Sequence, residues 1–175
     1  ILEPGGAIHR FEGGVRQKGF KETLKGLVRP AEKTANPRHQ ASTFARVARF
    51  NLWHGDADKA EEACLRALEK ARAADAAAPV SPLSGRAPRD MLRLLALIRF
   101  SRRDLDGAHR ALDEARRLTA PADRRVKGVI EHQTGLFRLE SNDPLGALEH
   151  LLLARAHKAA TADLAGEAAC LDAIA

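Results

Sequence analysis

Aromatic side chains are scarce in this chain of 175 residues, which has no Tyr, one Trp and six Phe. Enzyme pockets are usually lined by several aromatic groups, so this scarcity speaks against a substrate cleft. Cysteine is rare as well. Cys64 and Cys170 are too few for a disulfide framework and lack the spacing of a zinc site.

Long hydrophobic runs are also missing, so no segment of the sequence can cross a bilayer as a helix. Residues 1–30 carry charges throughout and lack the apolar core of a secretory leader. We therefore expect a cytoplasmic protein. The chain begins at Ile1 and ends at Ala175 inside an apolar helical pattern, and we interpret it as a piece of a longer protein.

Alanine is what the sequence has in abundance, with 34 residues. It favours helices because its side chain loses no conformational entropy there. The period-two alternation of half-buried strands is missing throughout. Hydrophobic residues make up 45% and charged residues 30% of the chain, which is a globular composition. The fold class that follows is all-α.

Helical periodicity is clear from Ala41 onward, and Gly, Pro and capping Asp residues divide the pattern into segments. These segments predict seven helices, over residues 41–53, 57–78, 89–102, 105–118, 124–140, 144–160 and 163–175. One further amphipathic stretch runs from Phe20 to Val28, but Gly19 and Gly26 weaken it as a helix.

The helices form pairs, and the pairs repeat one another. Each pair has a large residue followed by a small one, then a two-residue turn, then two alanines seven apart. Antiparallel helices approach closely only where side chains are small, so each pair needs these residues in the same places. The aligned sets are Val47-Ala48, Gly55-Asp56, Ala60 and Ala67; Leu95-Ala96, Arg103-Asp104, Ala108 and Ala115; and Thr134-Gly135, Asn142-Asp143, Ala147 and Ala154.

This pattern resembles the tetratricopeptide repeat (TPR) family. The resemblance covers residues 41–175, including the start of a fourth pair at Leu171, Ile174 and Ala175. It implies an antiparallel helix-pair solenoid, a right-handed superhelix whose first helices line a concave groove. The aligned alanines are 48 and then 39 residues apart, longer than the family's usual 34. Such long repeats are similar to helical arms of large bacterial signalling proteins and transcription regulators.

One position departs from the repeat. Glu131 stands where the other pairs have the apolar residues Phe44 and Leu92, so we expect the third pair to pack differently. A plain helical bundle with a chance similarity is the competing interpretation of the whole pattern.

Positive charge is concentrated at the N-terminus. The net charge is +6, and residues 1–40 hold eight Lys and Arg against four acids. We therefore divide the chain into a basic, Gly- and Pro-rich segment, 1–37, and a repeat domain, 38–175, with three pairs and a truncated fourth. A basic arm can steer a chain to nucleic acid or to an acidic partner. It lacks the interleaved aromatics of a base-stacking platform, and a solvated terminus is the plainer interpretation.

Catalytic and cofactor motifs are not found. The seven His are scattered, no HExxH motif occurs, and Gly13-Gly14 lacks the rest of a phosphate-binding loop. We expect no enzymatic activity, no cofactor and no metal.

The implied groove is where we expect binding. Residues beside the buried faces of the first helices mix apolar and basic groups, which suits an amphipathic or acidic peptide. Large groups here can instead fill core between repeats, which is the competing interpretation for Trp53 and Phe100. The predicted binding residues are Arg49 and Trp53 in the first pair, Arg93, Leu97 and Phe100 in the second, and His132 and Leu136 in the third.

The sequence thus predicts a non-catalytic regulatory module for protein–protein interaction. Its partner is a peptide segment or a domain, which can belong to the full-length chain itself. The alternative is a fragment of a nucleic-acid-associated transcription regulator that uses the basic N-terminal arm. We expect the last helix to expose Ala168, Leu171 and Ile174, because it has no partner helix. A second copy of the chain or the N-terminal segment could cover this face, or the end of the helix could fray.

Overall fold

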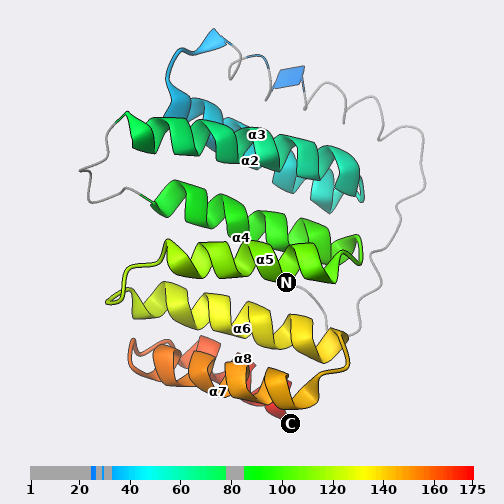
Figure 1. The fold of residues 1–175 in the computed structure, drawn as a ribbon, viewed down its shortest axis with the longest axis vertical. Coiled ribbons are helices and arrows are strands. Elements are labelled where there is room, and N and C mark those ends of the chain that lie inside the picture. The colour runs from blue at the N-terminus through cyan, green and yellow to red at the C-terminus, as the bar shows by residue number, and fades with distance from the viewer. Residues whose placement is uncertain (1–24, 27–28, 30–32, 78–84) are drawn as a thin grey trace. The chain divides into compact units, whose positions relative to one another are not determined.

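The computed structural model describes residues 25–26, 29, 33–77 and 85–175. In these residues the chain forms seven helices and no strand, which confirms the all-α prediction for the described part (Figure 1). Most of the predicted stretch Phe20–Val28 and most of the loop before the third helix lie outside the described residues; Lys25 and Gly26 are described and helical. The helices are α2 (Pro37–Trp53), α3 (Ala57–Ala76), α4 (Arg86–Ser101), α5 (Leu105–Arg117), α6 (Arg124–Glu140), α7 (Pro144–Ala159) and α8 (Leu164–Ile174).

The helix boundaries agree with the predicted ones to within a few residues, and those of α6 are the same. The largest difference is at α2, which begins at Pro37 rather than at Ala41. Asn36 accepts hydrogen bonds from the backbone N–H groups of Arg38 and His39. Pro37 fits the first turn, where a helix needs no N–H donor. None of the described helices combines the length and the apolar character needed to cross a membrane.

The same turn precedes four of the helices. Asp56, Asp104, Asp143 and Asp163 each cap a helix by accepting a hydrogen bond from the N–H group three residues later. The residue before each Asp has a positive φ, a conformation that glycine adopts at no steric cost. These residues are Gly55 at 79°, Arg103 at 63°, Asn142 at 59° and Ala162 at 54°.

The helices pack as pairs, α2 with α3, α4 with α5 and α6 with α7, while α8 packs on α7. The alanines that the repeat aligns are completely buried, as the alignment predicts. They are Ala60, Ala67, Ala108, Ala115, Ala147 and Ala154.

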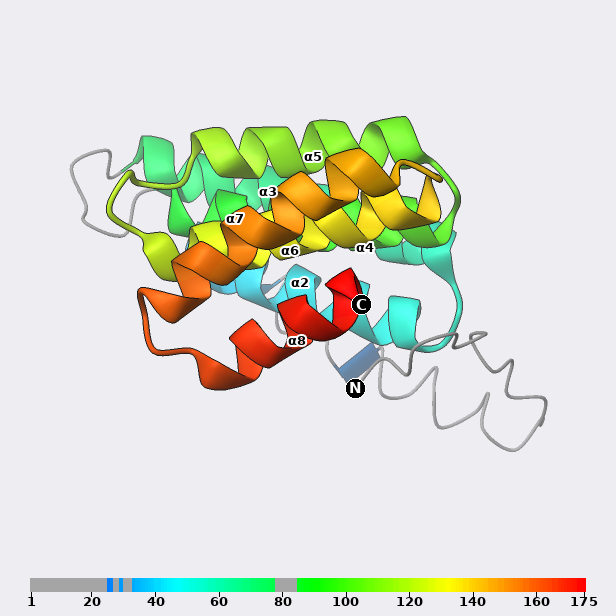
Figure 2. The same ribbon diagram turned by 90° about the horizontal axis from the view of Figure 1, so that it is seen from below.

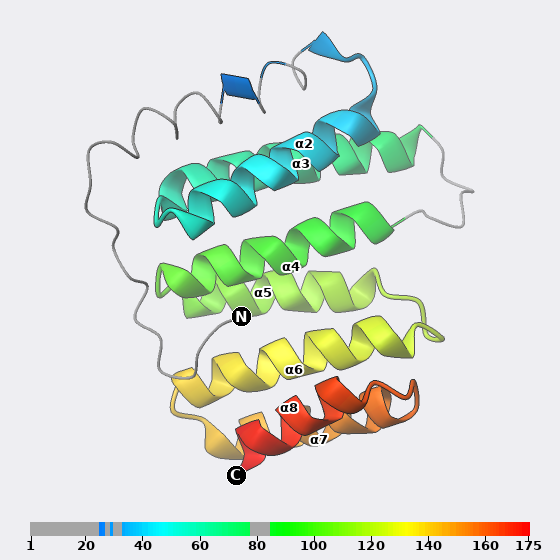
Figure 3. The ribbon, with the colours of Figure 1, turned by 180° about the vertical axis from the view of Figure 1, so that it is seen from behind.

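The chain divides into two compact units, Ile1–Ser81 with α2 and α3, and Pro82–Ala175 with α4 to α8. In the second unit, α4, α6 and α8 form one layer and α5 and α7 the other (Figures 2 and 3). Two contacts show that α4 and α6 run parallel. Arg89 at the start of α4 bonds Asp123, the N-cap of α6, at 3.0 Å. Phe100 near the end of α4 stacks on Phe137 near the end of α6.

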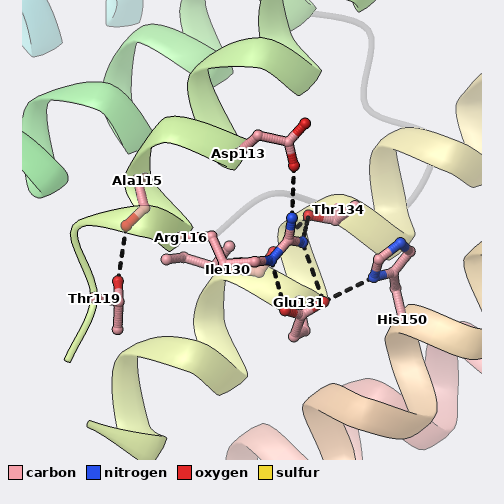
Figure 4. Close-up of polar contacts among 8 residues, drawn as sticks. All are labelled: Asp113, Ala115, Arg116, Thr119, Ile130, Glu131, Thr134 and His150. Carbon is pink, nitrogen blue, oxygen red and sulfur yellow. Dashed lines mark hydrogen bonds and ion pairs between the residues drawn. The ribbon is translucent and has the colours of Figure 1, made fainter. Parts of the chain in front are cut away.

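Glu131 marks the place where the third pair differs from the others. Its buried carboxylate accepts a hydrogen bond from Arg116 Nε on α5 at 2.9 Å and lies 2.7 Å from His150 Nδ1 on α7 (Figure 4). Polar contacts therefore replace here the apolar packing of Phe44 and Leu92.

Candidate functional site

The candidate binding surface in the second unit is the face that α4 and α6 share. Arg93, Leu97 and Phe100 follow one another at intervals of four and three residues, so they lie on one face of α4. On α6, Leu136 and Leu139 are exposed, whereas Leu97 and Phe100 on α4 are half-buried. Apolar groups from two parallel helices therefore border this surface.

Phe100 contributes to the contact between the two helices. Its ring lies 4.1 Å from that of Phe137, centroid to centroid, and the two planes are nearly parallel at 6°. Because Phe137 is buried, this stack supports the interpretation that Phe100 fills core between helices. The Phe100 side chain is half-buried, so part of it remains accessible.

Arg93 is held in a fixed position beside these apolar groups. Its Nε donates a hydrogen bond to Gln133 Oε1 on α6 at 3.0 Å, and its guanidinium lies 3.9 Å from Asp90. About a quarter of the side chain, 26%, is exposed. A fixed guanidinium at the edge of an apolar surface can pair with a carboxylate of a ligand.

His132 lies one turn before Leu136 on α6, but it is half-buried against α8, whereas Leu136 is exposed. Burial and the positive charge of Lys158 lower the pKa of His132, whose ring also faces the backbone of Ala169 on α8. Its Nε2 atom is buried and has no hydrogen-bond partner in the described part of the chain. We therefore expect Leu136, not His132, to contact a ligand.

Arg49 and Trp53 belong to the first unit, where both lie on the exposed side of α2, one turn apart. Trp53 is 81% exposed. Ala45, one turn before Arg49, is buried. The single cluster in which Arg49 and Trp53 join Arg93, Leu97 and Phe100 stays a prediction.

The first unit has a surface pocket that the sequence analysis missed. Its volume is about 290 Å³, and it lies between α2 and α3. The Arg66 guanidinium covers the ring of Phe44 at 4.2 Å. The buried Oδ1 of Asn51 has no hydrogen-bond partner among the described residues. The lining residues are Lys25, Phe44, Val47, Asn51, Lys59, Glu62, Ala63 and Arg66.

Metal ligation finds no support in the described ranges, where no group of three or more His, Cys, Asp and Glu could hold an ion. The sequence matches no protein-family model and has no significant match among curated proteins. The function proposed below therefore depends on the sequence pattern and the geometry.

Proposed function

We propose that this chain is a TPR-like helix-pair module that binds a segment of another protein across α4 and α6. Three features support a TPR-like solenoid. The aligned alanines are fully buried. A turn with a positive φ before a capping Asp recurs. The first helices α4 and α6 run parallel in one layer (Figure 3).

The exposed Leu136 is the observation that carries the binding role. It lies on α6 next to Leu139, and α4 adds the half-buried Leu97 and Phe100. Binding energy at protein interfaces comes mainly from a few apolar or Arg anchors. The favoured partner is a peptide with apolar side chains for this surface and a carboxylate for Arg93. The role is regulatory and non-catalytic.

A peptide selection tests the proposal. A phage-displayed library of random peptides is selected against the full chain, and the affinity of the winning peptides is measured by fluorescence anisotropy. Leu136→Glu should weaken their binding at least about tenfold, the loss expected of one anchor. Leu118→Glu at the C-cap of α5 is the matched control, because Leu118 is 40% exposed and Leu136 38%. Equal affinities of the two variants would contradict the proposal.

The same experiment separates the nucleic-acid alternative. A fluorescent DNA duplex replaces the peptide, and residues 1–37 are deleted. Binding to phosphates falls about 10³- to 10⁵-fold between 50 and 200 mM salt, whereas binding through apolar anchors changes little. Tight, salt-sensitive DNA binding that needs residues 1–37 but not Leu136 would favour the alternative.

A further inference from the structure

Helix α7 is apolar on the side that faces away from its own partner helix. It buries Ala147, Leu151, Ala154 and Lys158. The opposite side carries five exposed apolar residues, and Leu145 there is 81% exposed. Their spacing of three, four, four and three residues keeps them on one helix face. We call them the α7 stripe: Leu145, Leu148, Leu152, Ala156 and Ala159.

The other second helices of the repeat do not have this stripe. Aligning Ala147 with Ala108 and Ala60 gives the matching positions in α5 and α3. In α5 the first four matching positions hold Asp106, His109, Asp113 and Arg117. In α3 the five matching positions hold Asp58, Glu61, Leu65, Glu69 and Arg72. Each of those helices is followed by another pair and is still polar here. The continuation of a helical repeat therefore does not account for the leucines of α7.

Helix α8 extends the apolar surface on one side. Arg155 Nε on α7 bonds Glu167 Oε1 on α8 at 3.1 Å, so the two helices lie alongside each other (Figure 2). Leu171 follows Glu167 by one helical turn and is 45% exposed. The surface available to a partner therefore includes both helices.

The spacing of the stripe is symmetric about Leu152, with two leucines on its N-terminal side and two alanines on its C-terminal side. Leu145 and Ala159 both lie seven residues from it, and Leu148 and Ala156 both lie four residues from it. In an antiparallel pair of two α7 helices with Leu152 on the twofold axis, each outer leucine meets an alanine. A twofold interface must be complementary to itself, and large residues opposite small ones give close packing.

We propose that two copies of this chain associate through antiparallel α7 helices, with Leu145 opposite Ala159 and Leu148 opposite Ala156. This proposal is independent of the peptide surface on α4 and α6. The 16 residues of α7 span about 24 Å. A contact along one helix face of this length buries less area than the ~800 Å² that each partner contributes to a standard interface. Leu171 on α8 enlarges the area, and the dimer is reversible.

Charge also favours this face over others. The chain carries a net charge of +6, which disfavours association of two copies through its basic regions. Residues 144–175 hold two basic and four acidic side chains and thus lack the basic excess. Within the stripe itself there is no charged residue.

Sedimentation equilibrium of the full chain over a wide range of protein concentration tests the dimer. The wild type should shift from monomer to dimer, and Leu152→Glu should weaken association at least about tenfold, as for a central interface residue. Leu65→Glu is the matched control. Leu65 has the same repeat position in α3, and its exposed fraction is 44% against 48% for Leu152. It should associate like the wild type, and circular dichroism should show both variants folded.

A charge pair tests the antiparallel register. Leu148→Glu should weaken the dimer, and the added substitution Ala156→Lys should restore it, because the two positions face each other across the twofold axis. Ala156→Lys alone should also weaken it. A wild type that stays monomeric, a dimer indifferent to Leu152→Glu, or a double variant no better than Leu148→Glu would overturn the proposal.

Discussion

Glu131 on α6 and His150 on α7 lie with Oε2 and Nδ1 2.7 Å apart, and Arg116 reaches the same carboxylate from α5. The Glu131 side chain is only 10% exposed, so its carboxylate needs both partners to offset the hydration that it loses on burial. One acidic residue thereby links three helices of the second unit. The equivalent residues of the other pairs, Phe44 and Leu92, are buried apolar groups.

Replacing Glu131 by Gln should destabilise the second unit. Removing charged hydrogen bonds of this kind costs about 1.5–3 kcal/mol, and the exposed third of Arg116 places the expected loss near the lower end. Urea unfolding at neutral pH measures it. Glu140→Gln is the control, because Glu140 is exposed and lies 3.8 Å from Arg103. An equal loss in both variants would show that the Glu131 contacts contribute no more than an exposed ion pair.

The effect of Glu131 should depend on pH. Burial raises the pKa of Glu131. The hydrogen bonds with Arg116 and His150 lower it by a larger amount, so the pKa of Glu131 lies below its ordinary value. A carboxyl with a lowered pKa stabilises the fold above its unfolded pKa of about 4.3. The contribution is lost as the pH falls through the folded pKa. The difference between wild type and Glu131→Gln should therefore shrink in acid, and a constant difference would contradict this.

The helices and the burial of the aligned alanines could be predicted from the sequence because they depend on local signals. Capping Asp residues, Pro144 and the spacing of alanines need no knowledge of the rest of the fold. The partners of Glu131 could not be predicted, since Arg116 and His150 are 15 and 19 residues away. The position of His132 depends on how α8 packs. Neighbouring helices, not the helix's own sequence, decide which face a ligand can reach.

Enlarging the aligned alanines should overpack the contacts within pairs. Ala108 and Ala147 have no exposed surface, so Ala108→Leu or Ala147→Leu should cost about 1–3 kcal/mol of stability. Thermal unfolding followed by circular dichroism measures the change. Ala73 is exposed on α3, and Ala73→Leu should leave the melting temperature nearly unchanged. If the melting temperatures of the two core variants matched that of Ala73→Leu, the repeat register would be wrong.

Gly135 should resist even the smallest enlargement. A Cβ atom there would lie 2.7 Å from Leu151 Cγ and 3.2 Å from the Ala147 carbonyl oxygen, so α6 and α7 would have to separate. The cost of about 1–3 kcal/mol exceeds the roughly 0.5–1 kcal/mol that alanine gains over glycine in a helix. Gly135→Ala should therefore destabilise the fold in a urea titration.

Gly128 on the same helix provides the comparison. A Cβ atom added to Gly128 would lie 3.1 Å from Lys158 Cγ and 3.2 Å from His157 Cβ. A shift of α7 by a few tenths of an ångström relieves such contacts, and the helical preference of alanine offsets its cost. Gly128→Ala should be close to neutral. The reverse order of stability for the two variants would show that α6 and α7 are not closest at Gly135.

Ala162 should be better replaced by glycine. It precedes the capping Asp163 with a φ of 54°, where a Cβ atom costs about 1–2 kcal/mol. Glycine removes this cost but gives the unfolded chain more freedom, worth about 0.4–1 kcal/mol. Ala162→Gly should therefore stabilise the fold by up to about 1 kcal/mol in a urea titration.

Gly55 occupies the equivalent turn with a φ of 79° and nothing within 4 Å of an added Cβ. Gly55→Ala isolates the backbone effect and should destabilise the first unit. Opposite signs for the two substitutions would confirm that the same turn conformation recurs, whereas a loss of stability from Ala162→Gly would contradict the left-handed conformation at that residue.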